Sequence, residues 1–459
     1  NRNVRGFDPN ATLSITSAAE AAYAARPIPE IPASQWRARG GVQFASGDAR
    51  GFWNPDKNNI QPRLGFAYKV NDKTVVRGGT GVYVNPFVIA GVNQMGYSQS
   101  TPFTATQDRG LTFQSTLNNP YPRGVLQPAG NSLGPNTFLG QSLSRFAPIE
   151  RHNGNLLRYL VNLQHELPGQ WLFEAGYVGS RGYNLTTDIE LNNVPKEYLS
   201  TSRVRDQAAI DFLGAQFPNP FRGLLPTGFT GTNVSRAQLL RPFPQFNNVP
   251  TNAHDGTSRY DSAQFKIEKR FSQGYSVLAT YTRSKFTERV TMLNATDTEY
   301  ENRLSGSDVP HRVTTSILYE LPFGHGRRWG GGSSGVVNAL LGGWSVNAIG
   351  QFQSGRPIDF GGRNAYFDGD LDALKAKYTD NTDVPVFDVS GFYFHDAAVQ
   401  TNGVDDPVKQ RADPRIRLAN NLRYFPSRVD GIRSPFLKLW DISLVKQVPI
   451  GGRVRAQFN

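Results

Sequence analysis

The stretch AQFKIEKRFSQGYSVLATYT, residues 263–282, decides the fold. Apolar residues recur at alternate positions on both sides of Ser272-Gln273-Gly274, with mostly polar residues between them. The apolar positions are Ala263, Phe265, Ile267 and Phe271 before the turn, and Tyr275, Val277, Ala279 and Tyr281 after it. Successive side chains of a strand point to opposite faces, so this period of two predicts two antiparallel strands joined by a tight turn. Each strand has one apolar and one polar face.

Four further pairs of segments show the same alternation, which gives ten strands in all. They are 63–70 with 74–84, 157–166 with 171–177, 313–321 with 344–352, and 440–448 with 453–458. The pair 313–352 has a longer, glycine-rich turn. Strands of about 9–11 residues suit a tilted crossing of a lipid bilayer, whereas strands of soluble proteins average about 5–6 residues. Strand length therefore favours a membrane protein.

The connections between these segments alternate between short and long. Short turns join the members of each pair, and long segments rich in Pro, Asn, Gly and Asp join one pair to the next, at roughly 85–154, 184–258, 286–309 and 355–435. Up-and-down barrels of the bacterial outer membrane have short periplasmic turns and long extracellular loops. We therefore expect an all-β, antiparallel up-and-down transmembrane β-barrel in the bacterial outer membrane. Residues 59–459 supply its strands, and the four long segments are extracellular loops.

The first 58 residues are expected to be a further extracellular loop region. Residues 36–45 have the pattern of a strand or a hairpin arm, and residues 18–25 that of a short helix. The chain opens with Asn1 instead of Met and stops at Asn459 inside a strand-like pattern. We therefore expect these residues to be a piece of a larger precursor.

Composition excludes several classes of protein. The chain has no cysteine, so it has no disulfide framework, no thiolate metal site and no cysteine nucleophile. No run approaches the roughly 18 consecutive apolar residues that a transmembrane helix needs. The net charge of +12 suits a nucleic-acid binder, a surface facing anionic lipid, or a basic barrel lumen. Because the Lys and Arg residues follow strand parity and do not gather in one segment, we expect no nucleic-acid partner.

No motif indicates an enzyme, and no catalytic or cofactor-binding residue is predicted. Gly331–Gly335 matches G-x-S-x-G in letters only, because no buried strand precedes it, and the six histidines are scattered. Asp368, Asp370 and Asp372 form the one acidic cluster, in the longest loop. Alternating carboxylates suit Ca²⁺, so a loop-bound calcium ion is the single cofactor considered. The cluster lacks the glycine and glutamate of an EF-hand, and a solvated turn is the alternative.

An ordered series of short motifs resembles the large TonB-dependent outer-membrane receptors of the Oar-like type. The motifs are Ile60–Tyr68, Val75–Tyr83, Gly176–Gly182, Glu268–Ser272, Ala279–Ser284, Pro310–Arg312, Tyr319–Gly324, Gly342–Trp344 and Gln353–Pro357. The resemblance implies a 22-stranded barrel, an N-terminal carboxypeptidase-regulatory-like domain, and a plug domain whose TonB box draws on the proton motive force. Neither the N-terminal domain nor the plug is recognised in these residues.

The function expected from this resemblance is TonB-energised uptake of a scarce nutrient, either a metal chelate or an oligosaccharide. The expected partners are outer-membrane lipid and lipopolysaccharide, the TonB complex acting through the plug, and a small nutrient ligand. One alternative is a structural or adhesive outer-membrane barrel that displays binding loops. A second is a soluble, β-rich carbohydrate-binding protein.

Overall fold

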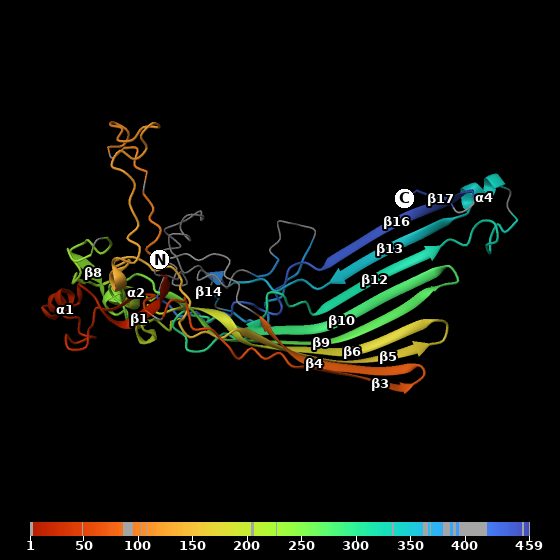
Figure 1. Ribbon diagram of the computed structural model, residues 1–459, viewed down its shortest axis with the longest axis horizontal. Helices are drawn as coiled ribbons and strands as arrows, with labels where there is room; N and C mark the ends of the chain where they lie inside the picture. The colour runs from red at the N-terminus through yellow and green to blue at the C-terminus, as the bar shows by residue number, and fades with distance from the viewer. Residues whose placement is uncertain are drawn as a thin grey trace.

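The hairpin of residues 263–282 lies in the middle of one large antiparallel sheet in the computed structural model (Figure 1). Its strands are β9 (Pro250–Ser272) and β10 (Tyr275–Arg289), and their register pairs Ile267 with Ala279 and Phe265 with Tyr281. The turn between them contains Gln273 and Gly274 at φ 55° and 87°. Positive φ at both positions is the geometry of the two-residue turn that matches the twist of the flanking strands, and glycine adopts it without strain.

The structure describes residues 3–47, 49–85, 95–101, 103–106, 108–202, 206–225, 227–332, 335–360, 366–367, 369–379, 386–388, 392–393, 420–451 and 454–458. Within these ranges every predicted strand is present and pairs with its neighbours along the chain, in the order β17-β16-β13-β12-β10-β9-β6-β5-β4-β3. The other strands of this path are β3 (Arg63–Asn71), β4 (Thr74–Asn85), β5 (Gly154–Leu167), β6 (Trp171–Glu190), β12 (His311–Glu320), β13 (Trp344–Gln353), β16 (Leu437–Gly451) and β17 (Val454–Phe458). A short strand, β11 (Arg303–Leu304), pairs with the far end of β10. The prediction of an all-β antiparallel meander is confirmed.

The register brings the apolar positions of the strands to one face of the sheet. Phe173 pairs with Ile267, Ile267 with Ala279, and Ala279 with Thr315. Directly paired residues share a face, so the alternation predicted for each strand becomes a continuous apolar surface. Its large side chains are solvent-exposed here: Phe66 by 58% and Ile442 by 69%. An exposed apolar surface of this extent requires an apolar environment, as a bilayer provides.

The two ends of the sheet differ in their connections (Figure 1). Tight turns lie at one end, after β3, β5 and β9, and the long connections lie at the other. The connection between β12 and β13 is the longest at the tight-turn end and contains α4 (Gly335–Leu341). The sorting of connections by length, which the sequence predicts, is therefore present in space.

Two strands extend further than their alternation indicates. After a bulge between Gly182 and Leu185, β6 and β9 pair again as far as Glu190 and Pro250. The connection consequently covers 191–249, where the sequence pattern predicted 184–258. Polar residues occupy both faces of this extension, with Asp188 and Asn252 on one face and Thr187 and Thr251 on the other, which removes the alternation that marks a strand.

The long connections and the N-terminal residues fold together at the far end of the sheet. β1 (Val4–Thr12) pairs with β2 (Arg39–Phe44) and α1 (Thr16–Ala24) lies between them in the chain, close to the helix and hairpin arm predicted in residues 1–58. This layer also contains η1 (Gly134–Asn136), η2 (Lys196–Tyr198), α2 (Gln207–Gly214), β7 (Gln216–Pro218), β8 (Asn233–Ser235) and α3 (Arg236–Leu239). Its core includes Trp36, Phe221 and Phe246, each at most 3% exposed. We call this unit the outer layer.

The remaining short elements lie in the last long connection, as β14 (Tyr366–Phe367) and β15 (Phe392–Tyr393), which pair with each other. Leu374, Phe425 and Ile432 form a second, smaller apolar core there. Among the described helices, none has the length and apolar character needed to cross a membrane.

Candidate functional site

The apolar face ends along an oblique line near the long connections. On β16 the last apolar residue of this face is Trp440, and the next residue on the same face towards the long connections is Lys438. On β5 the corresponding residues are Leu157 and Asn155. If direct pairs are followed from strand to strand across the sheet, Trp440 of β16 lies at the same level as His165 of β5, with one paired residue in each of the five strands between them. The aligned residues are Gly350, Thr315, Ala279, Ile267 and Phe173. The line therefore shifts by eight residues, from His165 to Leu157, over six steps from strand to strand.

This shift measures the tilt of the strands. With a rise of about 3.3 Å per residue and about 4.8 Å between strands, the line is inclined by about 40° to the direction that crosses the strands. An apolar band must lie parallel to the membrane plane, so the strands tilt by about 40° from the membrane normal. Outer-membrane barrels have tilts of about 35–45°.

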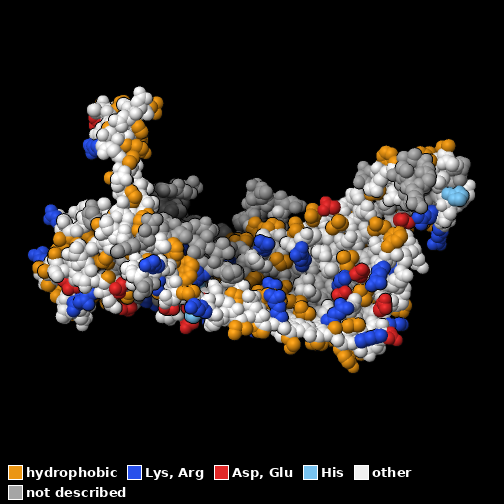
Figure 2. Space-filling model, in the orientation of Figure 1, with side chains coloured by type: hydrophobic (Ala, Val, Ile, Leu, Met, Phe, Trp, Pro, Cys, Tyr) orange, Lys and Arg blue, Asp and Glu red, His pale blue; other side chains and the backbone are white. Residues whose placement is uncertain are grey.

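The opposite face of the sheet is polar, and some of its charges are paired. Lys266 Nζ lies 2.8 Å from Glu268 Oε2 and 3.4 Å from Glu174 Oε1. Next to the tight-turn end, Arg327 pairs with Glu320 at 2.6 Å. Acidic and basic side chains lie close together over the sheet in the view of Figure 2. Neighbouring glutamates therefore hold Lys266 and Arg327 in place.

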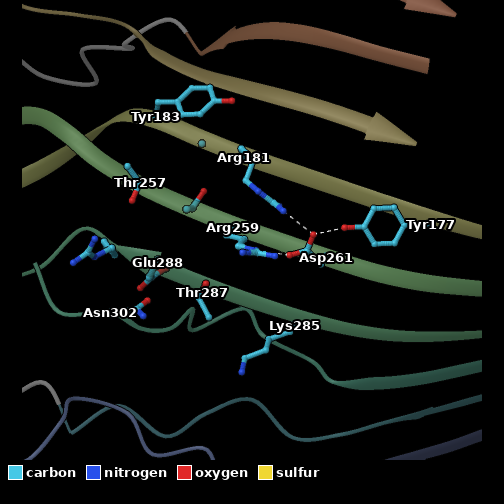
Figure 3. A pocket seen from close by; sticks show the side chains of 13 residues that line it. Tyr177, Arg181, Tyr183, Thr257, Arg259, Asp261, Lys285, Thr287, Glu288 and Asn302 are labelled. Carbon is cyan, nitrogen blue, oxygen red and sulfur yellow. Dashed lines mark hydrogen bonds and ion pairs between the residues drawn. The ribbon is translucent and has the colours of Figure 1, made fainter. Parts of the chain in front are cut away.

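A cavity of about 850 Å³ lies where β6, β9 and β10 approach the outer layer (Figure 3). Asp261 is its centre: Arg181 Nη2 lies 2.9 Å from Oδ1, Arg259 Nε lies 2.7 Å from Oδ2, and the hydroxyl of Tyr177 donates to Oδ1. Arg181 also donates to the carbonyl of Tyr260 at 3.0 Å. Asp261 and Arg181 are both a quarter exposed. We call the charged lining of this cavity the rim cluster.

The register places the rim cluster on the same face as the apolar band. Arg181 pairs directly with Arg259, and Asp261 with Lys285. Asp261 lies two residues from Ala263 and four from Phe265, so all three share one side of β9. The cluster is therefore beside the apolar band, at its outer end, and not on the polar face.

Ion pairs also join the long connections to one another. Glu288, at the end of β10, pairs with Arg303 at 3.0 Å and Arg428 at 2.7 Å, and Arg428 reaches Asp359 at 2.6 Å. Burial alone lowers the pKa of Arg428, but its hydrogen bonds to Glu288 and Asp359 outweigh burial and raise that pKa. A guanidinium held by two carboxylates stays charged and fixes the relative positions of the segments it joins.

The predicted calcium cluster is only partly within the described residues. Asp370 and Asp372 are exposed, and the backbone N–H of Asp372 donates to Asp370 Oδ1 at 2.9 Å, as in a turn. Asp368 lies outside the described residues. Across the described ranges, no three His, Asp or Glu side chains come close enough together to hold a metal ion. The calcium site therefore stays a prediction.

The other motifs considered in the sequence lie apart. His165 contacts Thr74 at 2.8 Å, and His311 contacts Tyr281 at 2.9 Å, on different parts of the sheet. Ser333 and Ser334 of the glycine-rich turn lie outside the described residues. Sequence reasoning missed the rim cluster, although a signal was present: the apolar positions of β9 change abruptly to Asp261 and Arg259 at unchanged parity.

A protein-family model described as "Outer membrane beta barrel domain" matches residues 1–459. No curated protein matches the sequence. Similar solved structures include the outer membrane transporter YddB from Escherichia coli, at 10% identity and a TM-score of 0.35, covering 89% of this chain and 36% of that one. The alcaligin outer-membrane receptor FauA from Bordetella pertussis has 12% identity and a TM-score of 0.27, covering 68% and 32%. The FrpB iron transporter from Neisseria meningitidis has 7% identity and a TM-score of 0.29, covering 65% and 27%. The chain thus spans about a third or less of the length of these structures.

Proposed function

The chain belongs to the outer-membrane β-barrel domain family and lies in the bacterial outer membrane, and from this premise we propose that it forms part of the wall of a receptor that takes up a scarce nutrient. The proposed cargo is a metal chelate or an oligosaccharide, and the proposed energy source is the TonB complex acting through a plug. The proposed barrel has 22 strands.

The observation that carries this proposal is the outer layer. Loops that only connect strands need a few residues each, whereas these connections build a core with buried aromatic residues from the N-terminal segment and residues 134–249. Trp36 stacks on Tyr23 with ring centroids 4.2 Å apart, and its indole N–H donates to the carbonyl of Leu239 at 3.1 Å. A rigid, folded layer at one end of a membrane wall is suited to present a binding surface to solutes.

The experiment replaces residues 194–246 of the full-length protein with a short Gly-Ser linker. The paired strands β6 and β9 stay intact, so the barrel is expected to reach the outer membrane, while uptake of the nutrient is lost. Uptake of iron chelates and of oligosaccharides is measured in cells with and without a protonophore. The proposal is contradicted if uptake persists in the linker variant, or if the protonophore leaves uptake by the wild-type protein unchanged.

A structural or adhesive barrel is the second candidate function. One observation favours it: the connection between β4 and β5 exposes large apolar side chains, with Leu111 87%, Phe113 72% and Leu117 101% exposed. Such side chains mark surfaces that meet a partner. Deleting residues 103–126 is expected to abolish adhesion under this second function and to leave it unchanged under the first. The third interpretation, a soluble carbohydrate-binding protein, disagrees with membership of an outer-membrane family.

A further inference from the structure

The outer end of the apolar band carries a concentration of positive charge. In the stretches 177–183, 257–263 and 281–289, the positions on the apolar side include five cationic residues and one carboxylate. The cations are Arg181, Arg259, Arg283, Lys285 and Arg289, and the carboxylate is Asp261. Three adjacent strands therefore place a positive surface directly beyond the apolar band. Figure 3 labels one of these cations from each strand: Arg181, Arg259 and Lys285.

Most of this charge is not neutralised by the protein. Asp261 serves both Arg181 and Arg259, and Arg259 is still 66% exposed. Arg283 donates to the His311 ring at 3.2 Å, and Arg289 lies 3.9 Å from a carboxylate of Glu299 that is itself 84% exposed. Lys285 is exposed and forms no ion pair with any residue that the structure describes.

Four of these cations line the cavity, namely Arg181, Arg259, Lys285 and Arg289, together with the carboxylates of Asp261 and Glu288. The cavity also offers neutral polar groups. Thr257, Ser258, Thr287 and Asn302 line it with hydroxyl and amide groups, and Tyr177 and Tyr183 lie at its edge (Figure 3). Guanidinium groups bind phosphate oxygens in a bidentate manner, and hydroxyl groups donate to the remaining oxygens. The lining therefore suits a phosphorylated molecule that is larger than a free phosphate ion.

The position of the cavity indicates which kind of molecule carries that phosphate. Tyr177 and Tyr281 end the apolar band on β6 and β10, and aromatic residues at this place mark the level of lipid headgroups. Phosphates of the outer leaflet lie just beyond that level. A soluble anion that crosses the barrel passes along the polar face, which is on the other side of the sheet.

We propose that the rim cluster binds the phosphorylated headgroup of an anionic glycolipid in the outer leaflet. The proposal rests on the proposed function only in placing the long connections outside the cell. Bound lipid fixes the wall against the leaflet at β6, β9 and β10, where Asp261 holds two of the guanidinium groups in position. Anionic lipid of this class was expected as a general partner, and the rim cluster gives that partner a site.

The test compares lipid binding by full-length protein in detergent micelles, using native mass spectrometry. The probes are diphosphorylated lipid A, the same lipid without phosphates, and inorganic phosphate. The variant combines Arg283→Gln, Lys285→Gln and Arg289→Gln. Its control combines Arg77→Gln, Arg270→Gln and Arg312→Gln, which removes the same charge from exposed positions on the polar face.

We expect wild-type protein to bind the diphosphorylated lipid at least about tenfold more tightly than the variant does, because each cation near anionic lipid contributes separately. The control is expected to bind within about twofold of wild type. Equal binding by variant and wild type, equal binding of the dephosphorylated lipid, or displacement of the lipid by millimolar phosphate overturns the proposal.

Two further measurements keep the outcome separate from folding and from transport. Heat-modified mobility in gels shows whether each variant is folded, and Lys285→Glu alone provides a milder change with the same expected direction. Nutrient uptake by the triple variant is expected to continue in cells. If wild-type cells take up no nutrient while the wild-type protein binds the diphosphorylated lipid and the triple variant does not, the proposed function fails and the rim site stands.

Discussion

Asp308 is an acidic residue with almost no contact with solvent. Its side chain is 1% exposed, Arg433 Nη2 lies 2.8 Å from Oδ2, and the backbone N–H of Phe286 donates to Oδ1 at 2.6 Å. The pair joins the connection after β10 to the connection before β16. A buried ion pair of this kind is costly to break, because the remaining charge loses its partner.

We predict that Asp308→Ala destabilises the junction between these two connections by about 3–5 kcal/mol, since Arg433 keeps only the exposed Asp430 as a carboxylate partner among the described residues. Hydrogen exchange of the amides around residues 305 and 433 measures the loss. Lys69→Ala is the control, because Lys69 and Asp72 are 64% and 95% exposed and such pairs contribute at most about 1 kcal/mol. Equal effects of the two substitutions would contradict this account.

Asp206 shows how a single carboxylate makes a helix sensitive to pH. It caps α2, its carboxylate accepts from Ser200 Oγ and from the backbone N–H of Ala209, and these bonds lower its pKa. A lowered pKa in the folded state stabilises the cap above the unfolded pKa of about 3.9, and this contribution is lost as pH falls through the lower folded value.

We predict that protection of the Ala209 amide against hydrogen exchange weakens below about pH 4. Asp206→Asn keeps a capping oxygen and removes the titration, so its protection is expected to change little over the same range. An unchanged wild-type profile between pH 3 and 6 would be inconsistent with a cap of this kind.

At the scale of elements, alternation predicted the ten strands along the main path of the sheet, but it missed the short β11 in the segment 286–309 and did not show where each strand ends. β9 and β6 extend through polar residues whose pairing depends on the partner strand and not on local pattern. The outer layer was beyond prediction for a related reason: Trp36, Phe221 and Phe246 meet through contacts between distant segments, which no local period reports. The charges of the rim cluster could be assigned to one face only once the register of β6, β9 and β10 was known.

Two neighbouring residues of β13 test the assignment of faces. Ala348 pairs with Ile317 and Ile442 on the apolar face, and Asn347 points to the other side. We predict that Ala348→Arg lowers the free energy of unfolding in lipid by about 2–4 kcal/mol, while Asn347→Arg lowers it by less than about 1 kcal/mol. Urea unfolding in vesicles compares them. A larger effect at Asn347 would mean that the face of Asn347, and not that of Ala348, meets the lipid.

At the scale of the whole molecule, the two ends of the sheet must face different compartments. These 459 residues contain no cysteine, so a single introduced thiol can be labelled without background from them. Asn118 is exposed in the connection between β4 and β5, and Asp72 is exposed in the tight turn after β3.

We predict that Asn118→Cys reacts with a membrane-impermeant maleimide in intact cells, because the long connections face the medium. Asp72→Cys is expected to react only after the outer membrane is permeabilised. Labelling is read by a mass shift of the purified protein. The opposite pattern would require the barrel to be inverted.

The 40° tilt has a consequence for the size of the bore. Strands about 4.8 Å apart that tilt by about 40° each occupy about 6 Å of circumference, so ten strands make about 60 Å of wall. Closed on themselves, ten would enclose a backbone cylinder only about 20 Å wide, which side chains fill. With 22 strands the diameter becomes about 40 Å, wide enough for hydrated solutes to diffuse through unless a second domain occupies it.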